Sequence, residues 1–233
     1  LLPDATIGPV EDGWEDAWRA FHRPVEVAGI WVGPPWESPP DPSRAVVIDP
    51  GGDVPRILEA IKQTGVTVEK IWLTHGHIDH VGGAADLRDA LQVKIEGPHI
   101  ADKYLLDNVV SSGARFGMTG VRNFGPDRWL DEGEKVTIGN LSFDILHCPG
   151  HSPGSLVFFS NELRFAHVGD VLFAGSVGRT DLPGGNHAEL INSIKTKLLP
   201  LGDDIGFVCG HGAGSSFGQE RMTNPFLTGE IEG

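Results

Sequence analysis

The sequence has little cysteine and little positive charge, and it lacks long apolar runs. Its two cysteines, Cys148 and Cys209, are too few for a disulfide framework, so a reducing compartment is expected. Lys and Arg number 18 and Asp and Glu number 32. The resulting net charge of −14 argues against a nucleic-acid partner, because such proteins usually carry a basic surface. No apolar run approaches the ~20 residues of a membrane helix, so no membrane partner is expected.

What is present is a globular composition, with 39% hydrophobic residues and 32 glycines in a chain of 233 residues. We expect residues 25–233 to form one domain. Residues 1–24 are expected to be an extension packed on it, because Trp14, Trp18 and Phe21 recur at helical spacing. The chain opens with Leu1 rather than Met. A cytoplasmic protein is expected, with a removed amino-terminal signal as the alternative.

The first half of the chain alternates between predicted strands and predicted helices. Strands are expected at residues 25–32, 45–48, 68–73 and 93–95, and helices at 54–63, 83–91 and 99–110, with a stiff proline-rich loop at 33–43. Short apolar runs separated by turns then indicate an antiparallel meander over residues 135–138, 141–146, 156–159 and 163–168. A helix at 187–198 and a strand at 205–209 follow. This order predicts an α/β layered domain of two mixed sheets flanked by helices.

The segment His75-Gly76-His77-Ile78-Asp79-His80 places three imidazoles and a carboxylate within six residues, directly after an apolar run. These side chains are the ligand types that suit zinc, iron or manganese. His75 and His77 are two residues apart, so in an extended turn they can point the same way. Asp79 and His80 begin the next segment and point elsewhere. One turn can therefore serve two neighbouring metals.

Three further candidate ligands, His151, Asp170 and His211, each follow an apolar strand and lie beside glycine, which lets the backbone pass close to a bulky site. Taken singly, each has an ordinary reading as a structural histidine or a turn residue. A zinc ion needs about four ligands, and the four groups of the hexapeptide cannot complete two such shells. The three residues are therefore expected to complete the site.

This ligand set, in this order, resembles the metallo-β-lactamase superfamily. The segments 45–52, 126–133, 146–154, 169–185 and 210–225 resemble its short bacterial glyoxalase-II-like hydrolases, and the likeness covers roughly residues 25–227. The resemblance implies a four-layer αββα sandwich with a dinuclear site. The implied cofactors are two divalent metal ions, zinc first and iron or manganese as alternatives.

The resemblance also implies a role for each ligand. One metal would be held by His75, His77 and His151, and the other by Asp79, His80 and His211. Asp170 would bridge both metals, and Asp79 would also orient the nucleophile. Asp49, at the end of an early strand, would fix a ligand imidazole, or else serve as a plain turn residue.

The implied activity is hydrolysis of a small acyl thioester or ester, such as S-D-lactoylglutathione, by a metal-bridging hydroxide. Two metals ~3.5–4 Å apart acidify a bridging water, and a thiolate leaves easily because the thiol pKa is about 8.5. Arg179 is the candidate for binding the substrate, with an ion pair to Asp181 as the alternative. Other implied activities are hydrolysis of another ester or a lactam, and persulfide dioxygenation at a single iron.

Four further features bear on other interpretations of this chain. Full-length glyoxalase II enzymes have a carboxy-terminal helical domain and helpful tyrosines, whereas this chain has only Tyr104, which puts glutathione specificity in doubt. The segment 150–154 matches the serine-nucleophile pattern G-x-S-x-G, but Pro153 has no N–H for an oxyanion hole. The two cysteines are expected to be small buried apolar residues, not ligands. Five other histidines lack the partners that would make them ligands: His22, His99, His147, His167 and His187. His147 and His167 alternate with apolar strand residues and are expected to be structural.

Overall fold

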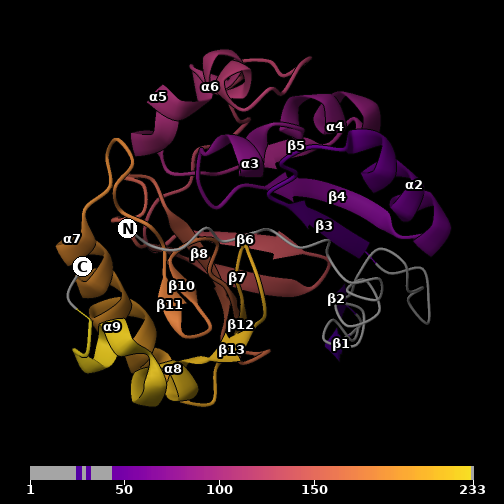
Figure 1. Cartoon of the computed structure of the whole chain (residues 1–233). Helices are drawn as coiled ribbons and strands as arrows, with labels where there is room; N and C mark the ends of the chain where they lie inside the picture. Colours follow the sequence, from indigo (N-terminus) through magenta and orange to yellow (C-terminus); the bar gives the residue numbers. More distant parts are fainter. Residues whose placement is uncertain (1–24, 28–29, 33–43, 232–233) are drawn as a thin grey trace, which may run out of the picture.

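The computed structural model describes residues 25–27, 30–32 and 44–231 of the chain. Two sheets pack face to face, and helices cover the outer side of each (Figure 1). The predicted αββα sandwich is confirmed by this arrangement. The amino-terminal extension at 1–24 and the proline-rich loop at 33–43 lie outside the described residues, so the predictions made for them stay predictions.

The small sheet is formed by the strands β3 (Arg44–Ile48), β4 (Thr67–Trp72) and β5 (Lys94–Glu96). All three run parallel, in the order β3-β4-β5. The helices α2 (Val54–Thr64), α3 (Ile78–Val81) and α4 (Ala84–Leu91) lie in the two connections. The prediction of a mixed sheet is wrong for these strands, because a connection long enough to hold a helix returns the chain in the same direction.

The large sheet has the order β13-β12-β9-β8-β7-β6. Its strands are β6 (Lys135–Ile138), β7 (Leu141–His147), β8 (Leu156–Ser160), β9 (Phe165–His167), β12 (Gly206–Val208) and β13 (Ser215–Ser216). The predicted antiparallel meander is confirmed from β6 to β9. Strand β12 runs parallel to β9, so this sheet is mixed, as predicted.

The segments that connect β9 to β12, together with the helices that follow β13, cover the outer side of the large sheet (Figure 1). They comprise the hairpin of β10 (Leu172–Phe173) and β11 (Ser176–Val177), the helix α7 (His187–Ser193), which continues as one π-helical turn, η2 (Ile194–Leu198), and the 3-10 turn η3 (Leu199–Leu201). After β13 come α8 (Phe217–Thr223) and α9 (Pro225–Thr228). These last two helices were not predicted.

Alternation of side chains along the central strands divides the interior into separate apolar layers. In β4 and the residue after it, Ile71 and Leu73 pack among the helices of the small sheet, whereas Trp72 faces the other sheet. There it stacks on Phe158, with ring centroids 5.0 Å apart. In β8, Phe159 points the opposite way, toward α7 and its neighbours. Burial on both faces explains why β8, in which every residue is buried, reads as a nearly continuous apolar run.

Two predicted elements are divided in the structure. The strand predicted at 25–32 is an antiparallel pair, β1 (Val25–Val27) and β2 (Ile30–Val32). The helix predicted at 99–110 consists of a 3-10 turn, η1 (Ile100–Asp102), and two short helices, α5 (Lys103–Leu106) and α6 (Val109–Arg115). The break falls at Asn108, whose φ of −119° leaves the helical region.

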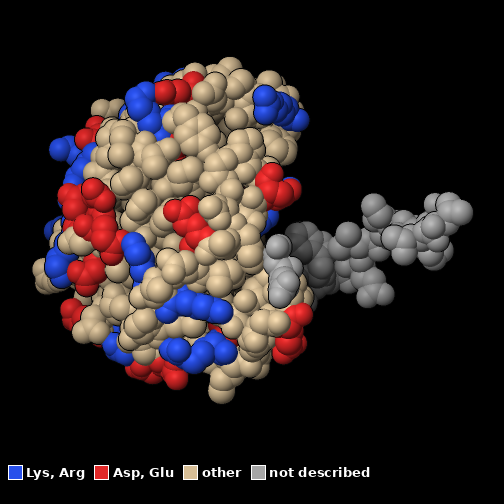
Figure 2. All heavy atoms as spheres, turned by 90° about the vertical axis from the view of Figure 1, so that its left-hand side faces the viewer, with Lys and Arg blue, Asp and Glu red and all other residues tan. Residues whose placement is uncertain are grey.

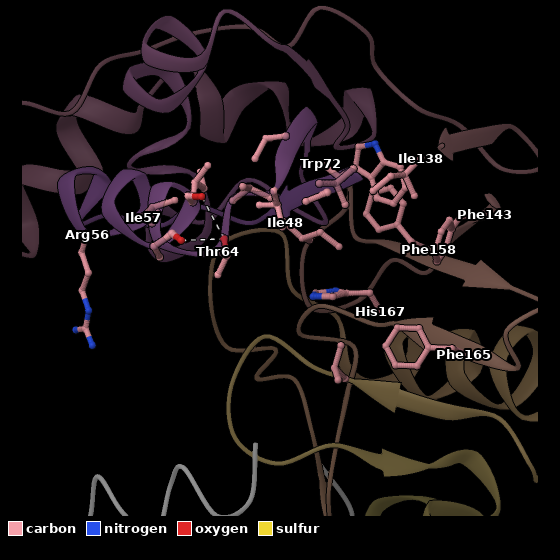
Figure 3. Close-up of a pocket in the computed structure, with 18 of the residues that line it drawn as sticks. Ile48, Arg56, Ile57, Thr64, Trp72, Ile138, Phe143, Phe158, Phe165 and His167 are labelled. Carbon is pink, nitrogen blue, oxygen red and sulfur yellow. Dashed lines mark hydrogen bonds between the residues drawn. The ribbon is translucent and has the colours of Figure 1, made fainter. Parts of the chain in front are cut away.

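An apolar cavity of about 610 Å³ opens between α2 and the two sheets. Trp72, Phe158 and Ile138 line one end, and His167 points into it (Figure 3). The Nδ1 atom of His167 is buried and has no hydrogen-bond partner among the described residues. None of the predicted metal ligands lines this cavity, so it is separate from the candidate site.

Surface charge and helix length are the two features that relate to nucleic-acid and membrane partners. On the face that carries α7 and α9, Lys and Arg side chains are interspersed with Asp and Glu (Figure 2). No helix within the described ranges combines the length and the apolar character needed to cross a membrane. The predicted absence of a nucleic-acid partner stays a prediction.

Candidate metal centre

The hexapeptide forms the turn between β4 and α3. His75 and His77 lie in its extended part, where His77 has φ −69° and ψ 149° and is the N-cap of α3. Asp79 and His80 lie in the first turn of that helix. The ring centroids of His75 and His80 are 4.0 Å apart and those of His75 and His77 are 4.8 Å apart, so the turn directs both pairs toward one cluster.

The structure brings His75, His77 and His151 together, and we call this group the first triad. The Nε2 atom of His151 lies 2.9 Å from His77 Nδ1 and 3.2 Å from His75 Nε2. Nitrogen ligands at ~2.0–2.1 Å from a tetrahedral metal are roughly 3.3 Å from one another. The spacing of the three ring nitrogens is therefore that of ligands around one metal ion.

Asp79, His80 and His211 form a second group, the second triad. The Nε2 atom of His211 lies 3.2 Å from both His80 Nε2 and Asp79 Oδ2. The remaining pair, His80 Nε2 and Asp79 Oδ2, is 3.7 Å apart. This triad also has the spacing of a single coordination shell.

Asp170 lies between the two triads. Its Oδ2 atom is 3.6 Å from His151 Nε2 and 3.5 Å from His211 Nε2. Its Oδ1 atom is buried without a hydrogen-bond partner among the described residues. A buried carboxylate oxygen needs a partner, and a metal ion beside it would supply one. The residues present therefore fit a bound metal.

The backbone passes so close to this carboxylate that only glycine fits at position 210. A Cβ atom there would overlap Asp170 Oδ1 and come within 2.6 Å of His80 Cε1. The sequence places glycine beside every predicted ligand loop, and the structure shows the reason at this one.

The protonation of the histidines differs between the triads. Burial lowers the pKa of His75 well below its ordinary value, lowers that of His77 to about 4, and lowers that of His151. These imidazoles are neutral at neutral pH, which is the form that binds metal. Burial also opposes protonation of His80, but the Asp170 and Asp49 carboxylates outweigh it and raise its pKa to about 10. These two carboxylates therefore stabilise a positive charge at His80.

Asp49, directly after β3, bonds to His80 of the second triad and reaches His75 of the first triad through Thr74. Its carboxylate accepts hydrogen bonds from the Thr74 N–H (2.7 Å), the Thr74 hydroxyl (2.6 Å) and His80 Nδ1 (3.0 Å). The Thr74 hydroxyl oxygen lies 3.0 Å from His75 Nδ1. These bonds leave Nε2 of both histidines facing the cluster. The role predicted for Asp49 stays a prediction, and the contribution of Thr74 was not predicted.

Arg179 has a different environment from the one expected of a substrate ligand. Its guanidinium donates two hydrogen bonds of 2.7 Å to Asp181, and both side chains are exposed. The structure thus shows the ion pair that was the alternative. The main-chain carbonyl of Arg179 accepts a hydrogen bond from His151 Nδ1 at 2.8 Å. Sequence reasoning missed this contact, because a carbonyl is present at every residue and gives no signal.

The other sequence candidates lie outside the cluster. Neither cysteine joins a metal-ligand group among the described residues. The Ser152 hydroxyl is buried and donates to Asp102, so it is not an exposed nucleophile. His147 stacks on His99, with ring centroids 4.0 Å apart, and bonds to the Pro153 carbonyl.

Comparison with known proteins places this site in a family. The model of the "Metallo-beta-lactamase superfamily" matches residues 41–211. Hydroxyacylglutathione hydrolase GloC of Haemophilus influenzae is 45% identical over 188 residues, which cover 80% of this chain and 89% of that protein.

Two solved structures are also similar. BLEG-1 B3 metallo-beta-lactamase is 36% identical with a TM-score of 0.74, covering 82% of this chain and 92% of that one. TTHA1623 in a di-iron-bound form is 35% identical with a TM-score of 0.72, covering 88% and 93%. These relatives confirm the prediction of a metal-dependent hydrolase at the level of enzyme class. The chain belongs to the metallo-beta-lactamase superfamily.

Proposed function

We propose that this protein is a dinuclear metal-dependent hydrolase of small acyl thioesters, of which S-D-lactoylglutathione is an example. The observation that carries the proposal is the position of Asp170 within 3.6 Å of ligand atoms in both triads. A carboxylate has two oxygens to share, so one residue can bind two metals. The di-iron form of TTHA1623, 35% identical to this chain, supports a site for two ions. Zinc and iron both suit the ligand set.

In this proposal the residues of the site have separate roles. The first triad and the second triad would each hold one metal, and Asp170 would bind both. When bound, such a metal pair supplies an acidified water as nucleophile and polarises the acyl carbonyl. The Asp79 side chain is 55% exposed, so its carboxylate can accept a hydrogen bond from that water and orient it.

A thioester suits this site for a chemical reason. Ser152 is bonded to buried Asp102, and both thiols have raised pKa values, Cys148 about 12 and Cys209 about 11, because burial disfavours the thiolate. None of the three is set up as a nucleophile. A thiolate leaving group needs no strong acid, since the thiol pKa is about 8.5. The name of the Haemophilus relative, a hydroxyacylglutathione hydrolase, supports the same substrate class.

Metal analysis alongside thioester hydrolysis tests the proposal. We expect two metals per chain in the purified protein and one in His80→Ala, which should also lose most of its turnover. His187→Ala, a change outside both triads, serves as the matched control and should keep both metals. Full thioesterase activity with one metal per chain would contradict the dinuclear mechanism. A single iron with oxygen consumption on a persulfide would instead indicate a dioxygenase.

A lactam hydrolase is the second candidate, favoured by the 36% identity to a B3 metallo-beta-lactamase. The same metal site can hydrolyse either substrate, because both reactions attack an acyl carbonyl. A chromogenic cephalosporin assayed beside the thioester at equal enzyme concentration separates them. We expect the thioester to show the higher kcat/KM, and the reverse order would favour the lactam.

A further inference from the structure

Asp102 is a buried carboxylate that no predicted role explains. It is the last residue of the 3-10 turn η1 and is fully buried. The turn is held in place by its N-cap, because the His99 imidazole accepts a hydrogen bond from the Ala101 N–H at 3.2 Å. The main-chain N–H of His99 donates to the Gly154 carbonyl at 3.3 Å. Asp102 is thereby fixed against the loop that carries His151.

The Asp102 carboxylate joins the two loops that supply the first triad. Its Oδ2 atom accepts from the Gly76 N–H at 2.8 Å, and Gly76 lies between His75 and His77. The same atom accepts from the Ser152 hydroxyl at 2.8 Å, and Oδ1 accepts from the Gly154 N–H at 2.6 Å. Ser152 directly follows His151 in the chain. One side chain thus connects both loops by three hydrogen bonds.

Both loops pack so closely against the segment of Asp102 and Leu105 that a side chain larger than glycine's has no room. A Cβ atom at Gly76 would come within 2.8 Å of Leu105, and one at Gly154 would come within 2.5 Å of Asp102. The three hydrogen-bond partners of Asp102 are uncharged, two main-chain N–H groups and one hydroxyl. A buried carboxylate is costly unless an opposite charge lies near it. A metal held by His75 and His77, on either side of Gly76, would supply that charge.

We propose that Asp102 is a positioning residue for the first metal, because it fixes the loops of His75, His77 and His151 relative to one another. This inference rests on the proposed dinuclear site. Residues that support metal ligands typically contribute 10–100-fold to metal affinity. The three hydrogen bonds of Asp102 go to Gly76, Ser152 and Gly154, which flank first-triad ligands, and none goes to a member of the second triad. We therefore expect its effect to fall mainly on the first metal.

Zinc affinity measured one triad at a time tests this. In a His211→Ala background, where the first triad is intact, Asp102→Asn should weaken zinc binding about 10–100-fold. In a His77→Ala background, where the second triad is intact, the same change should alter zinc binding less than about threefold. Competition with a chromophoric chelator gives both dissociation constants. Equal losses in the two backgrounds, or none in the first, would overturn the proposal.

Two further variants separate positioning from general stability. Glu220 is also buried and accepts hydrogen bonds from the Ser215 hydroxyl (2.6 Å), the Gly175 N–H (2.8 Å) and the Asn224 amide (2.8 Å). Glu220→Gln should therefore lower the melting temperature as Asp102→Asn does, without changing the zinc affinity of the first triad. If Asp102→Asn does not fold, Ser152→Ala removes one of the three bonds and should weaken first-triad binding about 2- to 10-fold. An unchanged affinity in Ser152→Ala would count against the proposal.

These measurements use no substrate. A protein that binds two zinc ions but hydrolyses no thioester would contradict the proposed function and leave the result for Asp102 intact.

Discussion

The two triads of the metal centre differ in their exposure to solvent. In the first triad His75 and His151 are buried, at 1% and 3% exposure. In the second triad only His80 is buried, and the side chains of Asp79 and His211 are 55% and 56% exposed. The first triad therefore lies on the protein side of the cluster, and the second faces the solvent from which substrate arrives.

The two triads also differ in how their ligands are supported. Two ligands of the first triad donate a hydrogen bond from the ring nitrogen that faces away from the cluster. His75 donates to the Thr74 hydroxyl and His151 donates to the Arg179 carbonyl. In the second triad Asp49 supports His80. His211 has no such bond among the hydrogen bonds of the described residues, apart from its contact with His80. We therefore expect the first metal to be held more tightly than the second.

Removing one ligand from each triad should give the largest effects and tests this difference directly. His151→Ala should lower kcat/KM more than about 10³-fold, because the best-supported metal is lost. His211→Ala should keep one metal and lower kcat/KM by about 10²–10³-fold. Metal content and steady-state kinetics are the measurements. If His211→Ala loses both metals and His151→Ala loses one, the assignment of the tighter site is reversed.

A methyl group at the junction of the triads should have the next largest effect. Gly210→Ala places a Cβ atom against Asp170 Oδ1 and His80 Cε1, so the carboxylate shared by both metals must move. We expect kcat/KM to fall about 10–100-fold and the second metal to bind more weakly. Gly206→Ala is the matched control, because it lies in β12 and its Cβ atom meets nothing within 4 Å. Equal behaviour of the two variants would show that the close approach at Gly210 has no role.

Much of this centre could be predicted because its ligands are rare residue types at fixed positions. The hexapeptide, His151, Asp170 and His211 come together as the sequence predicted, since each lies where an apolar strand ends. The layers were also predictable, because strand and helix periods differ. The parallel direction of the small sheet was predictable too, because the helices predicted at 54–63 and 83–91 fill its two connections, and the prediction of a mixed sheet did not use them.

The supporting contacts could not be predicted for a different physical reason. Asp102 stands in a segment whose composition reads as ordinary helix, and its importance comes from tertiary contacts with Gly76 and Gly154. Those partners lie 26 and 52 residues away and contribute main-chain N–H groups. The Arg179 carbonyl is a similar case, because position alone makes it a partner of His151.

Substitution of Arg179 should have a smaller effect, because its main-chain carbonyl supports His151 of the first triad while its side chain is exposed. Arg179→Ala keeps the carbonyl, so both metals should stay bound. If the guanidinium also binds an anionic thioester, KM should rise about 2- to 5-fold with little change in kcat, the size of an exposed ion pair. Asp181→Ala, which frees the guanidinium from its partner, should then lower KM. Unchanged KM in both variants would leave Arg179 with only its main-chain contact.

The smallest expected effect concerns the two thiols, Cys148 and Cys209. Cys148 is fully buried, and burial raises its pKa to about 12. Cys209 is partly exposed, and burial raises its pKa to about 11. Burial disfavours the Cys209 thiolate, so iodoacetamide should react slowly at pH 7. The rate should rise about tenfold per pH unit toward pH 11, as the thiolate fraction grows, while Cys148 stays unmodified in the folded protein.

Alkylation of Cys209 should disturb only the second triad. Its Sγ atom donates to the His211 carbonyl at 3.0 Å, and an added group removes that bond. The bond is a weak one, so the change in second-metal affinity should be about threefold or less, with the first metal unaffected. Peptide mass mapping with metal content on the modified protein measures both. The modified atom contacts only the loop of His211, so the second metal should be lost first. Loss of the first metal before the second would show that the first triad is not the better supported of the two.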